Sequence, residues 1–268
     1  MDLKFEQISK IRLKKPLIEA ITNYVTINDC ANAIIALGAS PAMCESAYEV
    51  YDFSLISNAV YINIGTLTKE QEYAMIQAIK AANDNNLPIV LDPVGCGAIP
   101  RRKSLINKMR KFGNIAVVRG NLGEIKALTG KDGKVRGVDC IDNGSDGINV
   151  CETLANEWNC IVAASGKKDI ITDGERTVLI NNGTKMLTKI TGTGCILGAI
   201  TAAFCGAETN YFSATIASHL TMSIAGEIAA NKEKGNLPGS FKVNLFDQFY
   251  ILNDETIKHN ANMTITKS

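Results

Sequence analysis

The chain has 268 residues, enough for one large α/β domain or two small ones. Its 46% hydrophobic and 21% charged residues are ordinary for a globular core, and a net charge of +1 excludes the basic footprint of a nucleic-acid-binding or membrane-surface protein. It contains no apolar run of about 18 residues, which a transmembrane helix needs, and its first residues lack an apolar signal segment. We therefore expect a cytoplasmic protein without nucleic-acid or membrane partners.

Strand and helix patterns alternate along the chain. Continuous apolar runs closed by a turn are typical of strands buried on both faces, and apolar residues every four positions, as at Ala74, Ala78 and Ala82, predict helices. In chain order we predict an extended segment over residues 16–25, a helix over 26–37 that ends at Gly38, strands over 39–43 and 59–65, a helix over 68–85, a strand over 87–95, a helix over 103–112, a strand over 115–120, a helix from 121, a surface loop over 130–147, a helix over 148–158, a strand over 160–164, a β-hairpin of 169–173 and 177–181, and two helices over 196–204 and 216–228.

This alternation defines the expected fold class. Strand–helix–strand units form right-handed crossovers, which place helices on both faces of a mostly parallel sheet. The sequence shows no linker, internal repeat or low-complexity tract. We therefore predict an α/β fold in which residues 1–268 form a single domain.

A glycine-rich stretch before the helix expected at 196–204 is the strongest functional signal. Residues 191–195 read Thr-Gly-Thr-Gly-Cys, so Gly192 and Gly194 lie where a loop becomes a helix N-terminus. Such a terminus presents free N–H groups and the positive end of the helix dipole, and glycine lets a phosphate approach closely. The same field is expected to lower the pKa of Cys195. The alternative is an ordinary glycine-rich turn before a core helix.

Polar residues follow several of the predicted strands. In open parallel sheets, ligands bind beyond the carboxyl ends of the strands. The residues expected there are Asp92, Arg119, Asn121, Glu124 and Ser165. Carboxylates suit a Mg²⁺ ion that keeps several waters, and arginine suits phosphate oxygens, so these residues indicate a phosphotransfer site. Simpler interpretations stay open: Asp92 shaping a turn, Glu124 capping its helix, and Arg119 in a structural ion pair.

Other patterns exclude several kinds of site. The sequence has no Walker motif and no G-x-G-x-x-G after the first strand, which disfavours P-loop NTPases and Rossmann dehydrogenases. The eight cysteines are irregularly spaced without a C-x-x-C pair, so we expect free thiols rather than disulfides or a zinc site. His219 and His259 have no partners at ligand spacing, which disfavours a histidine-based metal site.

Five segments occur in the order found in hydroxyethylthiazole kinases, and nearly the whole chain resembles that family. They are Ile-Thr-Asn-Tyr-Val (21–25), Ala-Leu-Gly-Ala-Ser-Pro-Ala-Met (36–43), Leu-Asp-Pro-Val-Gly (91–95), Arg-Gly-Asn-Leu-Gly-Glu (119–124) and Leu-Thr-Lys-Ile-Thr-Gly-Thr-Gly-Cys (187–195). The last is the most specific, because most ribokinase-like kinases carry Asp where Cys195 stands. The resemblance implies a ribokinase-like three-layer α/β/α fold and a homotrimer with active sites at subunit boundaries. It also implies transfer of the γ-phosphate of ATP to the alcohol of 4-methyl-5-(2-hydroxyethyl)thiazole, in thiamine salvage.

The resemblance further implies roles for individual residues. Those expected at ATP are Arg119, Ser165 and Asn121. Those expected at the thiazole are Met43, Asn23 and Gly192. Asp92 and Glu124 are expected to hold Mg²⁺ and its waters. Cys195 takes the position of the superfamily's catalytic base, and Gly192 and Gly194 are expected to be catalytic residues beside it. It either accepts the hydroxyl proton as a thiolate or contributes shape, with the N–H groups providing the catalysis.

The chain departs from the family pattern at three places. Glu19-Ala20 stands where His-Asn is common, Leu122-Gly123 where Ala-Ser is usual, and Ser165 where Thr is commoner. Two other functions remain open: a ribokinase-fold lyase that repairs hydrated nicotinamide cofactors, and a nucleotide-binding protein without catalysis. The lyases keep Asp at the position of Cys195, and the intact glycine-rich stretch argues against lost catalysis. Among kinases, an aminopyrimidine alcohol and pyridoxal are the alternative acceptors.

Overall fold

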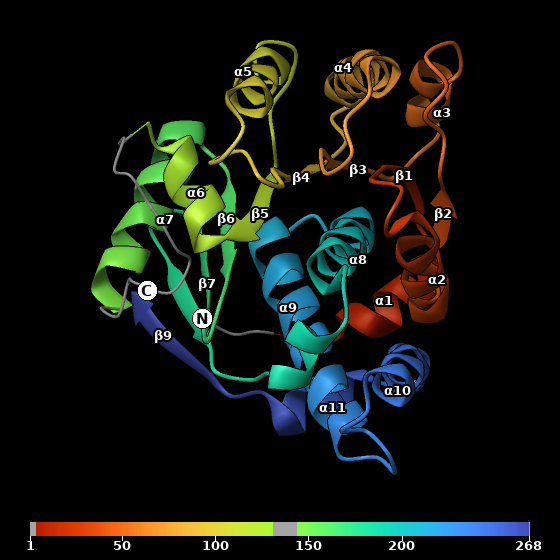
Figure 1. The fold of residues 1–268 in the computed structure, drawn as a ribbon, viewed down its shortest axis with the longest axis vertical. Helices are drawn as coiled ribbons and strands as arrows, with labels where there is room; N and C mark the ends of the chain where they lie inside the picture. Colours follow the sequence, from red (N-terminus) through yellow and green to blue (C-terminus); the bar gives the residue numbers. More distant parts are fainter. Residues whose placement is uncertain (1–3, 131–143, 268) are drawn as a thin grey trace.

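The computed structural model describes residues 4–130 and 144–267, and the strands within these residues form one sheet (Figure 1). The strands are β1 (Leu17–Ile21), β2 (Ser40–Ala42), β3 (Ala59–Asn63), β4 (Ile89–Asp92), β5 (Val117–Asn121), β6 (Ile161–Ser165), β7 (Asp169–Thr172), β8 (Thr177–Ile180) and β9 (Met263–Lys267). Their order in the sheet is β2-β1-β3-β4-β5-β6-β7-β8-β9. The first six strands in this order, β2, β1, β3, β4, β5 and β6, are parallel to one another. Strands β7, β8 and β9 extend the sheet in antiparallel fashion.

Helices cover both faces of the sheet. They are α1 (Gln7–Lys14), α2 (Ile27–Leu37), α3 (Val50–Leu55), α4 (Lys69–Asp84), α5 (Pro100–Met109), α6 (Leu122–Leu128), α7 (Gly144–Trp158), α8 (Thr193–Ala207), α9 (Tyr211–Ala230), α10 (Pro238–Ile251), α11 (Asp254–Asn260) and the 3₁₀ helix η1 (Lys185–Lys189). Helices α3 to α7 lie on one side, and α1, α2 and α8 to α11 on the other (Figure 1). The predicted α/β/α architecture with a mostly parallel sheet is confirmed.

The central strands are buried on both faces, as their apolar runs predict. Every residue of β3 and β4 is buried. Successive side chains alternate between two hydrophobic cores: Tyr61 and Val90 pack with α8 and α9, whereas Val60 and Leu91 pack with α4 and α5. Within the described part of the chain, no helix is long and apolar enough to cross a membrane.

Local signals explain several helix ends. Helix α4 starts with a capping box between Thr68 and Gln71. Helix α2 ends at Gly38, whose φ of +98° is unfavourable for other residues, as the sequence predicts. Helix α5 starts earlier than predicted, at Pro100, because proline suits the first helical position, where no N–H donor is needed.

The structure corrects some of the expected segments. The extended segment expected over 16–25 and the strand expected over 87–95 are shorter in the structure, because turns follow Ile21 and Asp92. Most of the loop expected over 130–147 lies outside the described residues, but residues 144–147 form the first turn of α7. Our sequence prediction also omitted α1, α3, α10, α11 and β9, although Phe241, Leu245 and Phe249 recur at helical spacing in α10.

Candidate active site

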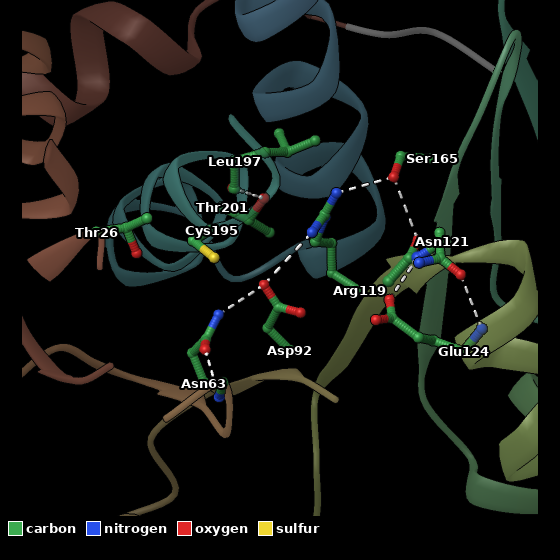
Figure 2. A network of polar contacts seen from close by, with 12 residues as sticks. Thr26, Asn63, Asp92, Arg119, Asn121, Glu124, Ser165, Cys195, Leu197 and Thr201 are labelled. Atoms are coloured by element: carbon green, nitrogen blue, oxygen red, sulfur yellow. Dashed lines mark hydrogen bonds and ion pairs between the residues drawn. The ribbon is translucent and has the colours of Figure 1, made fainter. Parts of the chain in front are cut away.

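The carboxyl ends of the parallel strands bring most of the predicted residues to one edge of the sheet. Asp92 ends β4, Arg119 lies in β5 and Ser165 ends β6. Figure 2 shows these side chains next to Cys195 and the start of α8. They come from segments far apart in the sequence, so their proximity follows from the parallel topology.

Helix α8 begins inside the glycine-rich stretch. Gly192 is its N-cap, with a φ of +85°, and a side chain there would overlap Thr26. A Cβ atom on Gly194 would lie 2.9 Å from Arg119 Nη1. The first N–H groups of a helix have no acceptor within the helix. The positive end of α8 therefore lies against a guanidinium group, an arrangement that favours a bound anion.

Asp92 is buried among hydrogen-bond donors. Its Oδ2 atom accepts from Asn63 Nδ2 at 2.9 Å, and lies 3.2 Å from Tyr61 Oη and 3.4 Å from Arg119 Nη1. Oδ1 is buried without a partner among the described residues. Burial raises the pKa of Asp92 to about 6, although Arg119 opposes that shift. Arg119 thus does form an ion pair, and Asp92 keeps one oxygen for a further positive partner.

Arg119 also reaches a large pocket. Its Nη2 donates to Ser165 Oγ at 2.8 Å, while its Nε has no partner among the described residues. Both residues line a pocket of about 790 Å³ between the loop after β6, η1, α9 and the start of α8. Cationic Lys167 lies at this pocket too, and Leu197 and Met222 supply apolar walls. A pocket with a cationic end and an apolar wall suits a phosphorylated organic ligand.

Asn121 and Glu124 form the capping box of α6. Asn121 Oδ1 accepts from the Glu124 N–H, and Glu124 Oε2 accepts from the Asn121 N–H, both at 2.9 Å. Glu124 Oε1 also accepts from the Gly95 N–H at 2.8 Å, which ties α6 to the turn after β4. The capping interpretation is therefore confirmed, and Asn121 is not among the residues that line the pocket. A carboxylate has about four acceptor positions, so Glu124 can still accept from a further ligand.

Cys195 lies in the first turn of α8, within reach of a buried amide. Asn23 Nδ2 donates to Cys195 Sγ at 3.2 Å and to Asn63 Oδ1 at 3.0 Å. Burial and the nearby Asp92 charge raise the pKa of Cys195, while hydrogen bonds from Thr26, Asn23 and Asn63 lower it less. The expected lowering of the Cys195 pKa is therefore not found, because loss of solvent and the Asp92 charge outweigh these hydrogen bonds.

Met43 follows β2 at the same carboxyl edge, where it packs half-buried against the core and does not line the pocket beside Arg119.

Among the described residues, no cluster of three or more His, Cys, Asp or Glu side chains could hold a metal. Mg²⁺ is usually held by one or two carboxylates plus phosphates and waters. Asp92 with its free Oδ1, and Glu124, fit that mode.

Three residues at the site were missed from the sequence. Asn63 links Asp92 to Asn23, and its Oδ1 also accepts from the Gly65 N–H at 2.9 Å. Tyr61 Oη donates to the Cys195 carbonyl at 2.9 Å, and Thr26 packs under Gly192. An asparagine in the apolar run of β3 was a usable signal. The other two residues match ordinary core and turn patterns.

The remaining cysteines carry no cross-link. The seven described cysteines, all except Cys140, are free, which agrees with the prediction from their spacing. Most are buried, and burial raises the pKa of Cys30, Cys96 and Cys205 to about 12. They therefore behave as small apolar core residues.

Comparison with known proteins identifies the family of the chain. The model of the hydroxyethylthiazole kinase family matches residues 8–255. A hydroxyethylthiazole kinase from Desulfitobacterium hafniense is 52% identical over 251 residues, which cover 94% of each chain. The structure of a hydroxyethylthiazole kinase protein from Pyrococcus horikoshii superposes with a TM-score of 0.89 at 36% identity, covering 98% of both chains. A ribokinase-like superfamily protein from Enterococcus faecalis, 11% identical, superposes with a TM-score of 0.63 over 90% of this chain and 88% of its own, which shows the shared fold.

These matches span nearly the whole chain and include every strand of the parallel part of the sheet. The ribokinase-like fold predicted from the sequence motifs is confirmed. The chain therefore belongs to the hydroxyethylthiazole kinase family and is an enzyme of that class.

Proposed function

We propose that the chain transfers the γ-phosphate of ATP to the hydroxyl of 4-methyl-5-(2-hydroxyethyl)thiazole, a step of thiamine salvage. The observation that carries this proposal is the position of Arg119 beside the N-terminus of α8, where a Cβ on Gly194 would lie 2.9 Å from Nη1. Two positive groups this close are stabilised by an anion. The phosphoryl group in transfer, with its charge spread over three oxygens, is such an anion.

The pocket beside Arg119 is the proposed nucleotide site. Its volume of about 790 Å³ lies in the usual range for small-molecule sites. Arg119 and Ser165 line it together with Gly194, so the phosphates of ATP would meet the start of α8 there. Asn121 contributes by holding Glu124 in place through the capping box. Arginine suits this role because its planar fork matches phosphate oxygens.

The acceptor is proposed to bind on the other side of the α8 N-terminus, against Asn23, Gly192 and Met43. The hydroxyl oxygen must lose its proton as it attacks phosphorus, and Cys195 is the group placed to take it. Asn23 orients the Cys195 sulfur through its 3.2 Å hydrogen bond. The N–H groups at Gly192 to Cys195, including that of Gly194, stabilise the charge on the transferring group.

Asp92 and Glu124 are the proposed magnesium residues. The free Oδ1 of Asp92 and the remaining lone pairs of Glu124 supply hard oxygen ligands, directly or through water. When bound, the ion would neutralise charge on the phosphate oxygens and align them. Arg119 holds Asp92 from the opposite side, so the carboxylate keeps its position with or without the ion.

Exposed apolar side chains near the acceptor side support a homotrimer with active sites at subunit boundaries. Tyr24 and Val25, next to Asn23, are 53% and 63% exposed, and Tyr48 is 95% exposed. Large apolar groups gathered at the surface commonly mark an interface. The single sheet supports our proposal that residues 1–268 are one domain, and use of ATP supports a cytoplasmic location.

The test is ATP consumption by the purified protein with Mg²⁺ and each of three acceptors: the thiazole alcohol, the aminopyrimidine alcohol and pyridoxal. We expect turnover with the thiazole alcohol at a kcat/KM well above the other two. No ATP consumption with any of the three acceptors would overturn the proposal. Nucleotide-dependent dehydration of hydrated NADH would then identify the protein as a repair lyase of the same fold.

A further inference from the structure

His219 forms a buried pair with a residue of the large pocket. It lies on α9 with no exposed surface, and its Nδ1 is 2.7 Å from Asp169 Oδ2. Asp169 opens β7, is itself buried, and lines the pocket together with Ser165 and Lys167. The histidine therefore reaches the pocket through a carboxylate and does not line it.

The second oxygen of Asp169 closes the turn between β6 and β7. Asp169 Oδ1 accepts from the Gly166 N–H at 3.0 Å. That turn carries Ser165, which accepts from Arg119 Nη2, and Lys167. One carboxylate thus joins helix α9 to the loop that forms one wall of the pocket.

The chemistry of the pair fixes the direction of the hydrogen bond. A carboxylate only accepts hydrogen bonds, so His219 Nδ1 is the donor to Asp169 Oδ2. Nε2 is buried and has no partner among the described residues. Without His219, Asp169 Oδ2 would lose this donor while Oδ1 kept the Gly166 N–H, so the histidine helps to fix the carboxylate in its present orientation.

We propose that His219 is a positioning residue for the nucleotide, acting through Asp169 to hold the loop of residues 165–168 against the pocket. This rests on the proposed function, because it takes the pocket beside Arg119 to be the ATP site. His219 touches neither substrate in this account. Its removal should therefore weaken nucleotide binding, with little effect on the acceptor or on the transfer step.

Two substitutions at His219 separate the effect of the hydrogen bond to Asp169 from the effect of side-chain size. An asparagine places its Nδ2 donor near the position of Nδ1, whereas a glutamine places its amide near the position of Nε2. We expect H219Q to raise the KM for ATP and the dissociation constant of a non-hydrolysable ATP analogue about tenfold, as loss of a hydrogen bond to a charged group does. The kcat and the KM for the thiazole alcohol should stay within about twofold, and H219N should stay near wild type.

Controls distinguish this role from general stabilisation. H259Q changes the other histidine of the chain, which is exposed on α11, and should leave every constant unchanged. Thermal unfolding of each variant reports stability separately. If H219Q does not fold, D169N serves instead: it keeps an acceptor for Gly166 but loses the charge, and should raise the KM for ATP about threefold.

The binding measurement keeps the two proposals apart. A wild-type protein that binds the ATP analogue but phosphorylates no acceptor would contradict the proposed function and leave the His219 comparison valid. A wild-type protein that binds no analogue would overturn both. Unchanged nucleotide affinity in H219Q, equal impairment of H219N and H219Q, or a parallel loss of both KM values and kcat would each overturn the positioning role.

Discussion

Arg119 connects the parts of the site at the scale of single residues. Its guanidinium pairs with Asp92, donates to Ser165 and lies under the backbone at Gly194. Only 6% of the residue is exposed, so its charge acts in a medium of low polarity, where it interacts more strongly than at the surface. These contacts use several donors of the planar fork at once, which a lysine cannot reproduce.

Replacing Arg119 by lysine should therefore lower kcat/KM for ATP about 100-fold, the equivalent of losing a bidentate charged contact. Steady-state kinetics with saturating thiazole alcohol measures the effect. Arg101→Lys is the matched control, because Arg101 is exposed and forms a surface ion pair with Glu72. An Arg119→Lys enzyme with wild-type kcat/KM would remove Arg119 from the nucleotide site.

The pH dependence of the rate tests Cys195 as the base. Burial holds the pKa of its thiol above the usual value, so little thiolate exists at neutral pH and kcat should still rise with pH between about 7 and 9. Cys195→Asp supplies a carboxylate, and its kcat should be nearly independent of pH in that range. Cys195→Ala should lower kcat about 10- to 100-fold. Full activity of the alanine variant would leave Cys195 only a role in shape.

The sequence was informative for polar residues toward the carboxyl ends of the strands and much less so for residues within the apolar runs. Asp92, Arg119 and Ser165 could be singled out because strand ends converge in a parallel sheet. Tyr61 could not, because a tyrosine in an apolar run is usually a core residue. The pKa of Cys195 was predicted in the wrong direction, because sequence shows a helix end but not how deeply it is buried.

At the scale of elements, α8 joins the catalytic stretch to the core. It is apolar along nearly its full length and lies against β3 and β4, so its N-terminus has little freedom to move. Gly198 continues this close fit, because a Cβ there would lie 2.6 Å from the Tyr61 ring. A continuous apolar run made α8 predictable, and Ile or Leu at every fourth position from Ile216 to Ile228 made α9 predictable. Helices α1 and α3 were missed because they are short, with few buried positions.

Gly194→Ala tests the close approach of α8 to Arg119. The new methyl group would lie 2.9 Å from Nη1 and displace the guanidinium, so kcat/KM for ATP should fall about tenfold or more while the melting temperature changes little. Gly239→Ala is the control: it lies in the first turn of α10 with open space around its Cβ position, and should leave activity unchanged. Equal activity of both variants would contradict the tight contact.

At the scale of the whole molecule, Glu19 is an unusual core residue. It lies in β1 with no exposed surface, and both carboxylate oxygens lack a partner among the described residues. Burial raises its pKa from 4.5 to about 8. The sequence showed Glu19 as a departure from the family pattern but did not show its burial, which depends on pairing of β1 with both β2 and β3.

Glu19 should make stability fall as pH rises. The folded chain keeps the proton up to about pH 8, whereas the unfolded chain releases it near pH 4.5, so the free energy of unfolding decreases between these values and levels off above them. Since one pKa unit corresponds to about 1.4 kcal/mol, the loss at pH 8.5 is on the order of 3–5 kcal/mol. Glu19→Gln should remove this loss of stability with rising pH. Urea unfolding at pH 5 and pH 8.5 measures this, and identical pH dependence in both proteins would contradict the assignment.

The central claim is that this edge of the sheet transfers phosphate from ATP to the thiazole alcohol. The most direct measurement follows the label from γ-labelled ATP in the presence of Mg²⁺ and that alcohol, with separation of the products. We expect that the wild-type protein places the label in the phosphate ester of the thiazole, and that Arg119→Lys does so far more slowly. Label found only in inorganic phosphate, or left in ATP, would contradict it.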